Sequence, residues 1–196
     1  WGRDASGRTG RMAGFGSLGE NAGSAELVHE ALKAVTAAWT LRGPETALSQ
    51  AFAEYAGAGS TAELLEIITL RDHRRVGPAA APLVFRVAAE GDPTAQRLVA
   101  WAGRELGSLA LGVIRQLGFA GLEFEVVLGG SFFKGSPVVA EKLAETVHAE
   151  APGAKIVRLS VPPVVGGVLL GLQTAGLDPR QVRARLVETV ESSNFF

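Results

Sequence analysis

The chain has 196 residues, 47% of them hydrophobic and 20% charged, so it can bury a sizeable core in one large or two small domains. A formal net charge of −1 provides no general attraction to nucleic acid or to an anionic membrane. The absence of cysteine excludes a disulfide framework, a thiolate nucleophile, an iron–sulfur cluster and a cysteine zinc site within this chain.

Charge or proline interrupts every apolar run well before the roughly 20 residues that a membrane span needs, and no signal-peptide pattern opens the sequence. We therefore expect a soluble, cytoplasmic protein that binds neither nucleic acid nor membrane. The histidines, at positions 29, 73 and 148, share no metal-ligand spacing, so no metal site is predicted on protein ligands. Because the chain opens on Trp1, we expect a processed product or a fragment.

The first half of the sequence predicts a glycine-rich segment followed by helices. Residues 1–23 are compatible with a hairpin and loop or with a ligand-binding loop, and spacing alone leaves both open. Ser24 is the expected N-cap of a helix that ends at Gly43-Pro44. The side chains expected on its buried face recur at helical spacing: Val28, Ala31, Leu32, Val35 and Trp39.

Two further segments carry start and stop signals before residue 91. A short helix at 46–55 is expected to bury Leu48, Phe52 and Tyr55, and 60–63 (STAE) is a capping box that opens the next helix. The basic cluster at 71–75 (RDHRR) fits either a phosphate site or a solvated helix end, and we favour the helix end.

Asp92-Pro93 marks the start of a long helix that Gly118 terminates. Gly103, Gly107 and Gly112 lie inside it, although each costs about 1 kcal/mol relative to alanine. This cost predicts that a neighbouring helix or a sheet presses closely on that face.

The second half reads as strand, helix, strand, helix. A buried strand at 126–128 leads into the Gly129-Gly130-Ser131 turn, and Ser136 with Pro137 marks the next helix start. A strand at 155–160, a helix from 165 and a last helix after Asp178 follow, and the last helix is expected to point Val182, Leu186 and Val190 inward. This order predicts a parallel strand pair with a right-handed crossover.

Known catalytic and nucleotide motifs are mostly missing from the sequence. Neither a Walker-type phosphate loop nor a dinucleotide fingerprint follows a strand, and no serine has a histidine partner that spacing supports. The strand-borne Gly-Gly-Ser turn remains, and its backbone can approach a flat base or a phosphate without side-chain interference.

Four motifs, in order, resemble one family. Residues 126–137 (VVLGGSFFKGSP) resemble the adenosine motif of sugar kinases of the N-acetylglucosamine kinase type, in the BadF/BadG/BcrA/BcrD ATPase group of the actin, hexokinase and Hsp70 superfamily. Residues 88–93 (AAEGDP) resemble the segment before that motif, and 166–171 (GGVLLG) the second connecting motif. Residues 14–20 (GFGSLGE) are similar to the region that lines the sugar side of the cleft.

The resemblance implies an α/β fold, the C-terminal lobe of a ribonuclease H-like (actin-like ATPase) protein. It would be helix-rich with an incomplete mixed sheet, a helical insertion at about 24–90, and no N-terminal lobe. ATP contacts are implied for Gly129, Gly130, Ser131 and Lys134. The sugar contacts implied are Gly16, Gly19 and Glu20, although Phe15 replaces the usual tryptophan and 20–22 (ENA) replaces Asp-Glu-Gly.

The function implied is phosphorylation of N-acetylglucosamine or a related amino sugar with ATP and Mg²⁺. The catalytic aspartate and both phosphate loops have no counterpart, so we expect the isolated chain to be inactive and to need the missing lobe as its partner; a homodimer is also compatible. The alternatives are an ATPase of the same group without sugar kinase activity and a non-catalytic binding or assembly module. An activator ATPase of the group would need cysteine ligands for an iron–sulfur cluster, which this chain lacks.

Overall fold

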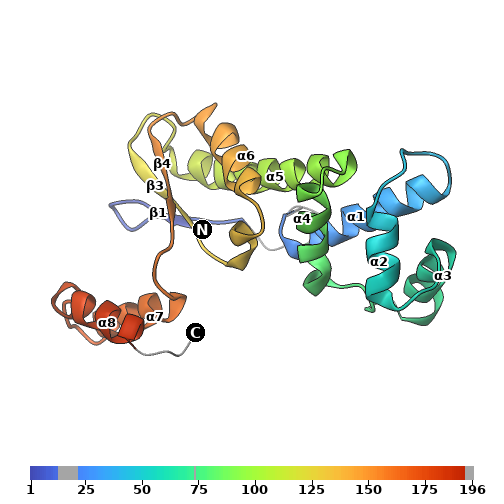
Figure 1. Cartoon of the computed structure of the whole chain (residues 1–196). Coiled ribbons are helices and arrows are strands. Elements are labelled where there is room, and N and C mark those ends of the chain that lie inside the picture. Colours follow the sequence, from blue (N-terminus) through green and yellow to red (C-terminus); the bar gives the residue numbers. More distant parts are fainter. Residues whose placement is uncertain (13–21, 73, 193–196) are drawn as a thin grey trace. The chain divides into compact units, whose positions relative to one another are not determined.

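The computed structural model describes residues 1–12, 22–72 and 74–192 (Figure 1). The fold is α/β and rich in helix, and the strands among the described residues form two pairs. In chain order the elements are β1 (Gly2–Arg3), β2 (Thr9–Gly10), α1 (Ser24–Trp39), α2 (Leu48–Ala56), α3 (Thr61–Glu66), a π-helical turn (Ile67–Arg71), a 3-10 turn (Pro78–Ala80), α4 (Ala81–Ala89), α5 (Pro93–Leu117), β3 (Phe124–Leu128), a 3-10 turn (Ser131–Lys134), α6 (Pro137–His148), β4 (Ala154–Arg158), α7 (Pro163–Thr174) and α8 (Arg180–Ser192).

The chain forms two compact units. The first comprises Trp1–Val126 and Gly130–Lys155, and the second comprises Val127–Gly129 and the chain from Ile156 onward. The predicted glycine turn is therefore divided, because Gly129 belongs to the second unit and Gly130 to the first.

The helices α1 to α4 and the first turns of α5 enclose the core of the first unit. Its largest fully buried side chains include Phe52 on α2, Leu27 on α1 and Leu64 on α3. The helical periodicity correctly predicts that Val28, Ala31 and Val35 on α1 and Leu48 and Phe52 on α2 are buried, whereas Leu32 is only half-buried. It is wrong at two helix ends, since Trp39 is 55% exposed and Tyr55 is 43% exposed.

The start of α1 also differs from the expected one. Gly23, with φ 116°, is the N-cap, and Ser24 is the first helical residue with no capping hydrogen bond from its side chain. The helix ends earlier than Gly43, because Leu41 adopts a left-handed conformation with φ 58°. The capping box at 60–63 is confirmed only in its first half: Ser60 Oγ accepts the Glu63 N–H at 3.1 Å, but the Glu63 carboxylate accepts the Gly59 N–H (2.8 Å) and not that of Ser60.

Asp92 joins the start of α5 to the segment before α2. Its carboxylate accepts the Ala95 N–H at 2.8 Å, which confirms the predicted N-cap, and it also accepts from Thr46 Oγ1 (3.0 Å) and Ala47 N (2.9 Å). Partial burial alone would raise the pKa of Asp92, but these hydrogen bonds stabilise the carboxylate and hold the pKa below its ordinary 3.8.

Helices α5 and α6 cross with their backbones in close contact. A Cβ on Gly103 would lie 2.6 Å from the carbonyl oxygen of Val139, and one on Gly107 would lie 2.6 Å from Thr146 Cβ. A neighbouring helix thus presses on this face, as predicted from the glycines. Gly112 instead faces the thioether of Met12, where a Cβ on the glycine would lie 2.8 Å from the sulfur. The crossing fixes the helix that follows the glycine turn.

The N-terminal hairpin lies against the last turns of α5. β1 and β2 pair antiparallel, Gly2 opposite Gly10, and Gly2 lies close to Val113 and Leu117. Arg8 donates from Nη2 to the Leu117 carbonyl oxygen at 2.7 Å and thereby caps the C-terminal end of α5. Gly118, with φ 72°, ends the helix as predicted.

β3 and β4 are hydrogen-bonded neighbours, and α6 connects them along the chain. The expectation of a buried strand is only partly correct, since Leu128 is 6% exposed but Val127 is 54% exposed. A sheet of two strands has few neighbours with which to cover its faces. The direction of the pairing stays a prediction.

The second unit contains α7 and α8, which contact one another. Val165 is buried, whereas Val182, expected to point inward on α8, is 40% exposed. The helix starts and the left-handed Gly176 (φ 79°) agree with the sequence, so the error lies in the buried face and not in the element.

Candidate functional site

The Gly-Gly-Ser turn is a true backbone turn that requires glycine at one position. Gly130 has φ 106° and ψ 159°, a conformation that residues with a side chain rarely adopt. A methyl group there would meet no atom of the described chain within 4 Å, so conformation and not space imposes the glycine. The open space leaves the backbone of this turn accessible.

Aromatic contacts anchor the residues after the turn to α4. The rings of Phe132 and Phe85 meet edge to face, with centroids 5.3 Å apart and planes at 64°. A Cβ on Gly135 would overlap the Phe85 ring, so glycine is required there by space, with an ordinary φ of −69°. Ser136 then caps α6 by accepting the Val138 N–H at 3.3 Å, which confirms the predicted start.

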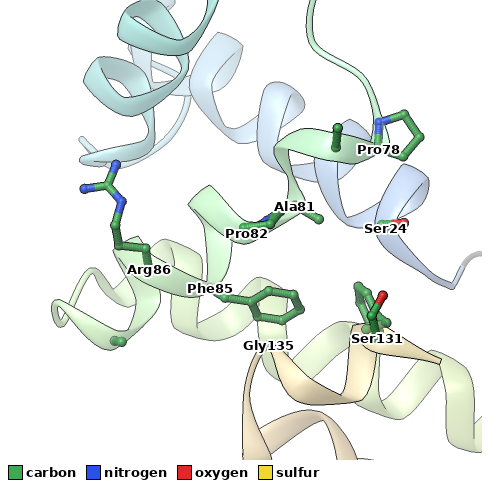
Figure 2. A pocket seen from close by; sticks show the side chains of 11 residues that line it. Ser24, Pro78, Ala81, Pro82, Phe85, Arg86, Ser131 and Gly135 are labelled. Atoms are coloured by element: carbon green, nitrogen blue, oxygen red, sulfur yellow. The ribbon is translucent and has the colours of Figure 1, made fainter. Parts of the chain in front are cut away.

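A cavity of about 550 Å³ lies beside this turn, within the first unit (Figure 2). Its lining comes from the start of α1, the 3-10 turn before α4, α4 itself and the turn after Gly130: Ser24, Pro78, Ala79, Ala81, Pro82, Phe85, Arg86, Ala89, Ser131, Phe132 and Gly135. The Phe85 ring points toward Gly135 and the Ser131 turn, while Arg86 extends from another part of the rim (Figure 2).

The chemistry of this lining suits binding better than catalysis. Carbon predominates, with hydroxyls from Ser24 and Ser131 and one guanidinium, that of Arg86. Arg86 pairs with Glu90 at 3.2 Å on the exposed surface of α4, where such a pair is weak and can exchange partners. The cavity offers apolar walls for a flat ring and, among the described residues of its lining, one cation at the rim and no carboxylate or imidazole to act as a base.

The predicted ATP contacts are only partly brought together. Ser131 lines the cavity and Gly130 precedes it in the chain. Lys134 is exposed and does not line the cavity. Gly129 belongs to the other unit, where a methyl on it would lie 3.9 Å from Leu159 Cδ2. The predicted sugar contacts, Gly16, Gly19 and Glu20, lie outside the described residues.

Sequence reasoning missed Phe85 and Arg86. They lie 45 residues or so before the turn, and nothing in the local pattern links the two segments. The available signal is the small-residue run before them, since 78–82 (PAAAP) cannot fill the space beside a helix as larger side chains would.

The basic cluster after α3 has structural partners. Arg71 pairs with Glu66 at 2.6 Å, and Arg75 donates from Nε to the Ala56 carbonyl oxygen at 3.1 Å. The second bond satisfies a free carbonyl at the end of α2. This supports the solvated helix end over a phosphate site for these two residues.

The described residues form neither a cluster of metal ligands nor a helix that could span a membrane. They contain no group of three or more histidine, aspartate or glutamate side chains that could hold a metal ion. Among these same residues, the helices are all too short or too polar to cross a bilayer.

Comparison with known proteins adds no assignment. No protein-family model matches the chain, and no curated protein matches it.

Proposed function

We propose that this chain is the nucleotide-binding lobe of an ATP-dependent phosphotransferase that acts on a sugar, N-acetylglucosamine or a related amino sugar. The observation that carries the proposal is the cavity of about 550 Å³ beside a glycine turn that leads from β3 toward α6. Turns between a strand and a helix are frequent nucleotide sites in α/β proteins, because they leave backbone groups open to a ligand.

The lining fits a nucleotide in two respects. Phe85, Phe132 and the proline side chains give apolar walls against which an adenine ring would lose contact with water. Arg86 supplies a guanidinium at the rim, and guanidinium groups bind phosphate oxygens bidentately. The Ser131 hydroxyl adds a donor and acceptor for the base or the ribose.

The fold proposed for the complete protein is ribonuclease H-like, as in the actin-like ATPases. Its support is the order strand, glycine turn, helix, strand, helix after residue 124, together with the helices that occupy most of 24–90. The resemblance of four motifs in this same order supports it independently.

In such an enzyme this chain would hold the base, and other residues would carry the phosphoryl transfer. The described residues supply neither a metal cluster nor a base in the cavity, so we assign them no chemical step. Mg²⁺, when bound with ATP, would supply positive charge that offsets the charge of the phosphates, and we assign none of the described residues to hold it. We expect no sugar phosphorylation by the 196 residues alone.

Calorimetric titration of the chain with ATP, ADP and adenosine tests the proposal. Arg86→Gln is expected to lower the affinity for ATP by about tenfold, which corresponds to the loss of one charge-assisted hydrogen bond, and to leave the affinity for adenosine nearly unchanged. Arg104→Gln, an exposed arginine on α5 outside the cavity lining, is the matched control. Equal loss in both variants, or no ATP binding by the parent chain, would refute this site.

A second titration series separates the alternatives. ATP binding that N-acetylglucosamine strengthens supports the kinase, and ATP binding without a sugar effect supports an ATPase of the same group. Binding of neither ligand supports a non-catalytic module that keeps the fold.

A further inference from the structure

A second surface hollow lies on the first unit, away from the cavity described above. Two cavities, of about 260 Å³ and 490 Å³, adjoin one another at their shared lining residues Thr46, Ser49 and Thr61, and we call the two together the groove. The groove runs from the end of α1 past the first turns of α2 to the start of α3. The other residues of its lining are Ala38, Trp39, Glu45, Ala47, Gln50, Ala53, Glu54, Ala58, Gly59 and Ser60. It shares no lining residue with the cavity beside the glycine turn.

Several polar groups in this groove have unused hydrogen-bonding capacity. The side chains of Glu45, Ser49 and Thr61 and the indole N–H of Trp39 form no hydrogen bond with another described residue. Trp39 is also 55% exposed at the edge of the groove, contrary to the buried position predicted for it. Carboxylate and hydroxyl oxygens beside an open indole ring thus converge on one hollow.

The walls of the groove are held in place by other bonds. Asp92 accepts hydrogen bonds from Thr46 Oγ1 and Ala47 N on one side. On the other side, Glu63 accepts the Gly59 N–H and donates its own N–H to Ser60 Oγ. Binding a ligand would therefore cost little in ordering these backbone segments.

The charges of the groove select against anionic ligands. Within the part of the chain that the structure describes, its charged lining residues are the carboxylates Glu45 and Glu54, without a lysine or an arginine. Glu54 accepts a hydrogen bond from Gln50 Nε2 at 2.8 Å, whereas Glu45 is unengaged among the described residues. Phosphate groups would meet repulsion here, while a neutral ligand with many hydroxyl groups would find acceptors.

From these observations we infer that the groove is a carbohydrate-binding site, in which Trp39 stacks on the apolar face of a pyranose ring and Glu45, Ser49 and Thr61 bind its hydroxyl groups. Indole presents a broad apolar surface with one polar edge, which matches a sugar ring. The volumes suit one or two pyranose rings, near the range of about 300–1,000 Å³ for small-molecule sites. The site is independent of the proposed phosphotransferase function.

Cellobiose, a neutral disaccharide, is the probe for an NMR titration of the ¹⁵N-labelled full chain. The chain has three tryptophans, Trp1, Trp39 and Trp101, whose indole N–H signals report separately. We expect a saturable shift of the Trp39 signal with a dissociation constant of about 1–10 mM, and none of the other two. Trp39→Ala is expected to abolish the accompanying shifts of the Ser49 and Thr61 amides.

Matched variants distinguish the groove from general sugar effects. Glu45→Gln should lower the affinity for cellobiose at least fivefold, because an amide is a poorer hydrogen-bond acceptor than a carboxylate. Glu141→Gln, on the exposed face of α6, and Trp1→Ala should leave binding unchanged. Unshifted Trp39 at about 100 mM cellobiose, equal affinity in Glu45→Gln, or tighter binding of AMP at the groove would each overturn the inference.

Discussion

The close crossing of α5 and α6 allows a sharp test by adding one methyl group. Alanine at position 103 is a better helix former than glycine by about 1 kcal/mol. Its Cβ, however, would lie 2.6 Å from the Val139 carbonyl oxygen and 2.8 Å from Lys142 Cβ. Backbone cannot move aside as a side-chain end can, so the overpacking cost belongs at the upper end of about 1–3 kcal/mol.

The net expectation for Gly103→Ala is a loss of about 2 kcal/mol in the free energy of unfolding. For a chain of this length that corresponds to a melting temperature lower by about 4–8 °C. Gly112→Ala in the same helix is the control, because the described atoms that its Cβ meets belong to the Met12 thioether, which can turn away. This variant is expected to gain up to about 1 kcal/mol.

Urea unfolding followed by circular dichroism at 222 nm measures both variants. The two substitutions add the same methyl group to the same helix, so propensity cancels in their difference and only the contact remains. If Gly103→Ala is as stable as Gly112→Ala, the close packing of these helices does not occur in solution.

Three other substitutions test features of the first unit. Asp92→Ala should lower the free energy of unfolding by about 2 kcal/mol at neutral pH, because it removes the cap on Ala95 and the hydrogen bonds to the segment before α2. Since the pKa of Asp92 is lowered in the folded state, this stabilisation is present above pH 3.8 and is lost as the pH falls below it. Urea unfolding of the parent and the variant across this pH range would detect the loss. Leu41→Gly should stabilise by up to about 1 kcal/mol in thermal unfolding, because Leu41 is 91% exposed with φ 58°; a loss of stability would contradict that conformation. Arg8→Ala should speed amide hydrogen exchange in the last turn of α5 by up to about tenfold, since Arg8 caps the Leu117 carbonyl; unchanged exchange there would argue against the cap.

Local chemistry explains which parts of the fold the sequence predicts. Ser60, Asp92 and Ser136 each accept an N–H two or three residues ahead, so the sequence alone carries the information for these helix starts. The N-cap predicted at Ser24 is wrong because Gly23, with φ 116°, occupies the N-cap position of α1. Both residues are frequent N-caps, and only the backbone path distinguishes them.

Whether a side chain is buried depends on how far the neighbouring helix or strand extends, and the spacing of apolar residues in the sequence does not encode that length. Trp39 continues the apolar stripe of α1 but lies at the last position of the helix and is 55% exposed, whereas Val35, one turn earlier, is fully buried. Val127 belongs to a strand of apolar sequence, yet among the described strands β4 alone pairs with it. The glycines inside α5 predict packing more reliably than the apolar stripe does, because their low helix propensity is explained by a closely packed neighbouring element.

The candidate site was predictable on one side only. The turn at Gly130 and Ser131 follows from the residues themselves, whereas Phe85 and Arg86 reach it through the packing of α4. No spacing rule links two segments that meet through tertiary structure. Lys134 is near the turn in sequence but does not line the cavity, so its contact with ATP stays a prediction.

The contact between Gly135 and Phe85 gives the cavity beside the glycine turn a natural spectroscopic reporter. The α-protons of Gly135 lie close enough to the aromatic ring to experience its ring-current field, which displaces their chemical shifts from those of an exposed glycine. Any molecule that enters the cavity and turns the Phe85 side chain must change that field. Occupancy can therefore be followed in the unmodified protein from a single glycine resonance.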